Sequence, residues 1–141
     1  MAKGFVHEVS VRLSHVDGAR IVYFARIVDY FHEAYEGFLD AGGCSLAKVL
    51  EDSEWVAPIV HVEVDFKSPL RLGETACIEV SAHEKGEHSM VLYYRAWDKN
   101  TPERTIATGH TKHVFVDASS FKKTKVPPAI ERVLESVPKH P

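Results

Sequence analysis

Apolar and polar residues alternate near the start of the chain. Between His7 and Leu13 every second residue is apolar, which is typical of a half-buried strand. From Ile21 to Asp40 the period changes, and bulky apolar residues recur at steps of four and three: Phe24, Val28, Phe31, Tyr35 and Phe38. This spacing predicts a long amphipathic helix, which ends at the glycine pair 42–43.

More alternating runs follow the predicted helix. They cover residues 60–66, 76–82, 90–96 and 105–116. The turns at 84–88 and 98–103 are short and polar, which suits antiparallel strands joined as hairpins. A helical turn is predicted at 45–51 and a last helix at 129–137, where a proline precedes the first turn. The order of one strand, a long helix and four strands predicts an α+β fold in a single domain, 1–141.

Composition and charge narrow the class of protein. The 141 residues are 45% hydrophobic and 26% charged, and 17 Lys and Arg against 20 Asp and Glu leave a net charge of −3. A disordered chain would be less apolar, and a nucleic-acid binder would carry a basic excess. No apolar run approaches the roughly 20 residues that span a bilayer, and the first residues lack the apolar core of a signal peptide. We therefore expect a cytoplasmic protein with neither a membrane nor a nucleic-acid partner.

The sequence lacks the usual motifs for cofactors and metals. Neither GxGxxG nor GxxxxGKS/T occurs, so no nucleotide cofactor held by such a loop is expected. The two cysteines are far apart and do not suggest a structural zinc site. His110 and His113 are predicted on opposite faces of a strand. His61, Glu63 and Asp65 share one face, which a solvated strand surface explains better than metal ligation, so no bound metal is expected.

One carboxylate stands where chemistry is plausible. Asp17 lies between the first strand and the long helix, where unpaired backbone N–H groups and the helix dipole can stabilise a developing negative charge. A nucleophile or general base would then lie beside an oxyanion site. Spacing alone favours a simpler interpretation, in which Asp17 is an N-cap or turn residue before Gly18.

The stretch around Asp17 resembles the opening of a known family. Its sequence, VRLSHVDGARIVYF, is similar to the strand end, aspartate loop and helix start of the 4-hydroxybenzoyl-CoA thioesterase group of hotdog-fold proteins, including the acyl-CoA thioesterases associated with the Tol-Pal system. The matching residues are His15, Asp17, Ala19, Ile21, Val22, Tyr23 and Phe24. Val60 to Leu72 resembles the family's second strand and its proline-bearing turn. The resemblance implies a hotdog fold, an antiparallel five-stranded sheet wrapped around a long central helix.

The resemblance also implies an activity. It predicts a thioesterase that hydrolyses an acyl-CoA or aryl-CoA to the free acid and CoA, with no cofactor apart from the CoA of the substrate. Asp17 corresponds to the catalytic carboxylate, acting as nucleophile or general base, and the backbone N–H of Phe24 to the oxyanion donor. A non-catalytic acyl-CoA or small-ligand binder on the same scaffold is the alternative. A hotdog dehydratase or hydratase fits less well, because those relatives use a His and acid pair in another sequence setting.

His15 and Arg20 flank the aspartate where the family usually has an acidic residue and a glycine. His15 could orient a water molecule if the first strand continues, or be an inert surface histidine. Arg20 could pair with Asp17, contact a CoA phosphate, or be solvated. Tyr23 is assigned to the acyl pocket, although core packing would explain it equally well.

The resemblance also implies how the protein binds CoA and that it associates with itself. Lys85 and His88 stand in a turn that grips the nucleotide end of CoA in the family, and they are assigned to the substrate. The basic run 122–125 is a second candidate for the phosphates, or a solvated surface. Hotdog proteins pair edge to edge, so the resemblance implies a homodimer or homotetramer in which a second subunit completes the pocket.

Overall fold

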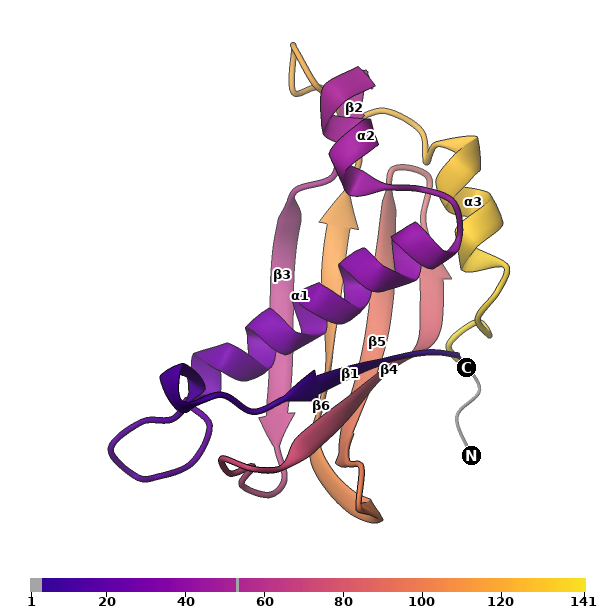
Figure 1. Ribbon diagram of the computed structural model, residues 1–141. Helices are drawn as coiled ribbons and strands as arrows, with labels where there is room; N and C mark the ends of the chain where they lie inside the picture. The colour runs from indigo at the N-terminus through magenta and orange to yellow at the C-terminus, as the bar shows by residue number, and fades with distance from the viewer. Residues whose placement is uncertain (1–3, 53) are drawn as a thin grey trace.

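A computed structural model describes residues 4–52 and 54–141, and its main element is one antiparallel sheet (Figure 1). The strand order is β1-β4-β5-β6-β3, and each neighbouring pair is antiparallel. The strands are β1 (Phe5–Ser10), β3 (Ile59–Phe66), β4 (Thr75–Lys85), β5 (Ser89–Asp98) and β6 (Thr101–Val114). Helix α1 (Phe24–Ala41) lies across one face of the sheet. This is the predicted α+β hotdog arrangement.

Helix α1 is held against the sheet by its apolar stripe. The buried residues of the helix are Ile27, Tyr30, Phe31, Ala34, Tyr35, Phe38 and Leu39. The Phe31 ring stacks on Tyr94 of β5 with ring centroids 4.7 Å apart. Gly109 of β6 permits this approach, since a Cβ there would lie 2.9 Å from the Phe31 ring. Burying one side chain of this size contributes about 1.5–3 kcal/mol, so the stripe holds this face of the helix against the sheet.

The remaining elements are short. They are a 3-10 turn η1 (Leu13–His15), α2 (Leu46–Asp52), β2 (Trp55–Val56), β7 (Val116–Asp117) and α3 (Pro128–Leu134). Strands β2 and β7 pair with each other in a two-stranded ribbon outside the main sheet. In the described part of the chain, no helix is both long enough and apolar enough to cross a membrane.

The structure corrects two of the predicted strands. The first ends at Ser10, and Leu13 lies in the 3-10 turn with 74% of its surface exposed. The last predicted strand, 105–116, begins earlier, at Thr101 within the predicted turn, and divides into β6 and β7. It divides because the N–H of Phe115 donates to the carbonyl of His88 in the β4–β5 turn, which takes this residue out of the strand ladder.

The two edge strands of the sheet differ in how well they are covered. On β1, Phe5 packs against Phe38 of α1, with ring centroids 6.2 Å apart. On β3, seven of the eight residues are exposed, including Val60, Val62 and Phe66. An exposed edge strand that presents apolar side chains on one face is a template for pairing with another strand.

Candidate active site

Asp17 lies in a loop that closes on itself before the helix. The backbone N–H of Asp17 donates to the carbonyl of Ile21 at 3.0 Å. The Oδ1 atom of Asp17 accepts the N–H of Ala19 at 2.8 Å, so the turn role that spacing predicted is present. The Oδ2 atom has no recorded partner within residues 4–52 and 54–141. The carboxylate therefore keeps one oxygen for a ligand.

Helix α1 begins without a side-chain cap. The start predicted at Ile21 is wrong, because the N–H of Val22 donates to the carbonyl of Leu70 at 2.8 Å and the helix begins only at Phe24. The N-cap residue, Tyr23, makes no capping hydrogen bond, and the first turn holds no acidic residue. Among the residues described, the N–H of Phe24 has no protein acceptor. An uncapped helix start attracts negative charge, which makes this N–H a candidate oxyanion donor.

Asp17 and Phe24 line the same pocket. Its volume is about 460 Å³, and its walls include Ile27 of α1, Phe66 at the end of β3 and Leu70. The rings of Phe24 and Phe66 meet edge to face with centroids 6.3 Å apart, and both are more than half exposed. A carboxylate and the first residue of a helix thus line one pocket, and its aromatic rim suits an apolar substrate.

His15 supports the loop instead of lining this pocket. Its Nδ1 lies 2.7 Å from the hydroxyl of Tyr30 and accepts the N–H of Arg12 at 3.2 Å. Burial raises the pKa of Tyr30 to about 12, so its hydroxyl stays protonated at neutral pH. The first strand does not continue to His15, which lies in the 3-10 turn and is not among the residues that line the pocket. The geometry therefore favours a positioning role over the orientation of a water molecule.

Arg20 and Tyr23 flank the pocket without lining it. Arg20 is exposed and has a φ of 66°, and in the described chain no ion pair joins it to Asp17. That leaves a phosphate contact or solvation for its guanidinium group. Tyr23 is 46% exposed and packs on Phe24 with ring centroids 4.7 Å apart, so it is not a core residue.

Comparison with known proteins decides the family. A family model described as the thioesterase-like superfamily matches residues 11–134. The chain belongs to this superfamily. It is 33% identical over 127 residues to a 1,4-dihydroxy-2-naphthoyl-CoA hydrolase of Rippkaea orientalis, covering 90% of this chain and 92% of the relative. It is also 33% identical over 132 residues to the enzyme of the same description from Nostoc punctiforme, covering 94% and 87%.

Solved structures of two thioesterases have the same fold. A 1,4-dihydroxy-2-naphthoyl-CoA thioesterase from Synechocystis superposes with a TM-score of 0.86 at 26% identity, covering 92% of this chain and 94% of that one. A gentisyl-coenzyme A thioesterase superposes with a TM-score of 0.80 at 25% identity, covering 92% and 98%. The chain is a thioester hydrolase of the acyl-CoA thioesterase type with the hotdog fold.

Two of the expected CoA-binding residues of this thioesterase, Lys85 and His88, lie at the far end of the sheet from Asp17. The end of β1, which precedes Asp17, pairs with the beginning of β4, whereas Lys85 is the last residue of β4. Lys85 pairs with Glu131 of α3 at 3.3 Å. The Nδ1 of His88 hydrogen-bonds the carbonyl of Thr124, within the basic run, at 3.0 Å. Within one chain, these groups do not meet Asp17.

A second pocket, which the sequence did not reveal, lies at that same far end. Its volume is about 370 Å³, and it is lined mainly by apolar groups, among them Tyr35 of α1, Leu50 of α2, Trp55 of β2 and Ile59 at the start of β3. His32 adds one imidazole to the wall. The pocket exists because α2 and β2 fold back beside α1, and no local sequence pattern signals that tertiary contact.

A buried polar chain adjoins the second pocket. The hydroxyl of Tyr94 lies 2.8 Å from the Thr111 hydroxyl, which lies 2.8 Å from Nε2 of His113. The rings of Tyr35 and His113 are 4.5 Å apart. Burial, followed by the nearby His32, lowers the pKa of His113 to about 4, so its imidazole is neutral at neutral pH. These hydrogen bonds fix the side chains on which Tyr35 rests.

Proposed function

We propose that the chain hydrolyses an aryl-CoA thioester, with 1,4-dihydroxy-2-naphthoyl-CoA as the substrate. The observation that carries the proposal is the pocket that Asp17 and Phe24 line together, at a helix start where the N–H of Phe24 has no protein acceptor among the described residues. The names of the relatives supply the aryl group, since those at 33% identity are 1,4-dihydroxy-2-naphthoyl-CoA hydrolases. These names favour an aryl-CoA substrate. The similarity to the thioesterases associated with the Tol-Pal system stays a prediction from the sequence.

The proposed reaction uses the helix start and the carboxylate together. The thioester carbonyl oxygen accepts the N–H of Phe24, which stabilises the negative charge that develops on that oxygen. Asp17 either attacks the carbonyl carbon or removes a proton from the water molecule that attacks it. The carbon–sulfur bond then breaks, the CoA thiolate leaves and takes up a proton, and the acyl group departs as the free acid. If Asp17 attacks directly, water hydrolyses the resulting anhydride.

We also propose that two chains pair through β3. The apolar, exposed edge of this strand supports the pairing, because β3 has a hydrogen-bonded neighbour, β6, on one side only. A two-fold axis perpendicular to the sheet would pair β3 with its own copy in antiparallel fashion, giving one continuous sheet. Such a dimer is the smallest assembly in which this edge is covered.

Antiparallel pairing would bring the two pockets together. Phe66, at the end of β3, lines the Asp17 pocket, whereas Ile59, at its start, lines the second pocket. In this antiparallel pair, the end of β3 in one chain lies beside the start of β3 in the other chain. The carboxylate of one chain would then act on a thioester whose aromatic group lies in the apolar pocket of its partner.

Release of CoA thiol from a panel of CoA esters tests the proposed function. The panel contains 1,4-dihydroxy-2-naphthoyl, benzoyl, short aliphatic and medium aliphatic esters. We expect turnover with the highest kcat/KM for the naphthoyl ester. Turnover that is fastest with an aliphatic ester would overturn the choice of substrate, and binding of the esters with no thiol release would favour the non-catalytic binder.

A further inference from the structure

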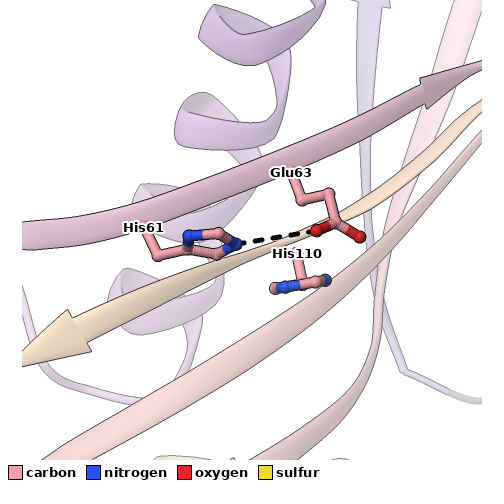
Figure 2. Close-up of side chains that lie close together, drawn as sticks. All are labelled: His61, Glu63 and His110. Atoms are coloured by element: carbon pink, nitrogen blue, oxygen red, sulfur yellow. Dashed lines mark ion pairs between the residues drawn. The ribbon is translucent and has the colours of Figure 1, made fainter.

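Three side chains with metal-binding groups meet on the face of the sheet that is turned away from α1 (Figure 2). His61 and Glu63 are two residues apart on β3 and therefore share one face. The β3–β6 register pairs Glu63 with His110. The sequence pattern placed His61 and Glu63 on one strand face and His110 apart from them. It could not predict the cross-strand register that brings the three together.

The distances bring the three side chains near the geometry of a metal site. One ligand atom from each side chain lies within 4.8 Å of those from the other two. The Nε2 of His61 is 3.7 Å from Oε1 of Glu63, and the His61 and His110 rings are 5.4 Å apart with planes at 27°. Two ligands at about 2.1 Å from a tetrahedral zinc ion lie about 3.4 Å apart. Small rotations of these side chains would therefore close the site.

The neighbouring side chains partly order this cluster. His110 is half-buried, and its ring lies 5.4 Å from that of Tyr93, whose hydroxyl donates to Glu84 at 2.9 Å. Asp65 follows Glu63 on the same face of β3 and adds negative charge. Lys112 is opposite His61 in the register and adds an opposing positive charge on a flexible, exposed side chain.

We propose that His61, Glu63 and His110 bind one Zn²⁺ ion. Two imidazoles and one carboxylate select zinc and similar transition ions over Mg²⁺ and Ca²⁺, which prefer oxygen ligands. The ion joins the edge strand β3 to its neighbour β6, and water occupies its remaining position. This site does not depend on the proposed function, because it lies on the opposite face of the sheet from α1 and outside the Asp17 pocket.

Zinc titration of the full chain, without a polyhistidine tag and stripped of metal, tests this proposal. By calorimetry we expect one ion per chain. Replacing either imidazole, in His61→Asn or His110→Asn, should weaken binding at least about 10-fold. The matched control is His7→Asn, which removes a histidine that also pairs with a glutamate, Glu33 at 3.4 Å, but has no second imidazole recorded beside it among the described residues.

Thermal unfolding gives a second readout that separates zinc binding from activity. Because only the folded chain presents the three ligands together, Zn²⁺ at about 100 times its dissociation constant should raise Tm by roughly 5–10 °C, and Mg²⁺ should not. Melting in chelator should be alike for wild type and variants, since the side chains are largely exposed. Absence of stoichiometric binding, or undiminished binding by the His61→Asn/His110→Asn double variant, would overturn the proposal.

Discussion

The two pockets beside α1 differ in what their walls provide. The pocket at the N-terminal end contains a carboxylate with one unpaired oxygen and a helix start that lacks a cap. The pocket at the other end is lined by Tyr35, Trp55 and other largely apolar groups, and the neighbouring His113 is kept neutral by burial. The first can stabilise charge, and the second can hold an aromatic group.

The difference suggests that chemistry and recognition are separated along one helix. A missing N-cap costs about 1 kcal/mol of stability, and at α1 it leaves an N–H available to a substrate. Among the described residues that line the apolar pocket, none carries a carboxylate. Each pocket is thus suited to one half of the proposed reaction, and pairing of β3 would place the two halves side by side.

Removal of the carboxylate should produce the largest effect. In Asp17→Asn the side chain keeps its shape and can still accept the N–H of Ala19, but it can neither attack nor serve as a base. We expect kcat to fall about 10²- to 10⁴-fold. The matched control is Asp29→Asn, which changes an exposed acid of α1 that pairs with Arg26 and should retain activity within about twofold. An active Asp17→Asn enzyme would show that chemistry takes place elsewhere.

A charge on the β3 edge tests whether the two pockets work together. In Val62→Asp, two like charges would face each other across the proposed two-fold axis, so we expect dimer affinity to fall about 100-fold and activity to fall with it. Analytical ultracentrifugation and thiol release measure the two quantities. Leu72→Asp, at another exposed apolar position, is the control. A fully active monomer would refute the shared site.

Filling the second pocket tests its role in recognition. Leu50 is 72% exposed and lines this pocket, so Leu50→Trp can occupy the space without disturbing the core. We expect kcat/KM for the naphthoyl ester to fall about 10-fold, while kcat/KM for acetyl-CoA stays nearly constant. Leu50→Ala serves as the control for loss of the native side chain. An equal effect on both esters would show that the second pocket plays no part in substrate recognition.

The buried His113 should affect stability and not the chemical step. The folded-state pKa of His113, about 4, is below its ordinary value of 6.5, so the unfolded chain takes up a proton first. The neutral His113 contributes at most about 3 kcal/mol to the free energy of unfolding. This contribution is complete above pH 6.5 and is lost as the pH falls toward 4. Chemical denaturation from pH 7 to 4.5 should therefore show falling stability, with a shallower slope in His113→Gln. Because burial also lowers the pKa of His83, the stability of His113→Gln should still fall with pH, but less steeply. An unchanged slope would contradict the assignment to His113.

The sequence predicted the elements better than the contacts between them. The aromatic stripe of α1 and the hairpins of β4, β5 and β6 follow from local periodicity, and the structure confirms them. The start of α1 could not be predicted in the same way, because the carbonyl of Leu70, distant in sequence, holds Val22 extended. The second pocket and the His61–His110 proximity likewise depend on tertiary packing and strand register. The choice of Asp17 depended on the family resemblance, because spacing alone favoured a turn residue, and its catalytic role stays a prediction.

A crystal structure of the chain with a non-hydrolysable naphthoyl-CoA analogue tests the central claim most directly. The account predicts that the carbonyl oxygen of the analogue lies about 2.7–3.1 Å from the N–H nitrogen of Phe24. The Asp17 carboxylate should face the carbonyl carbon, and the aromatic rings should occupy the pocket of a partner chain beside Ile59. A carbonyl group out of reach of both Phe24 and Asp17 would contradict the account.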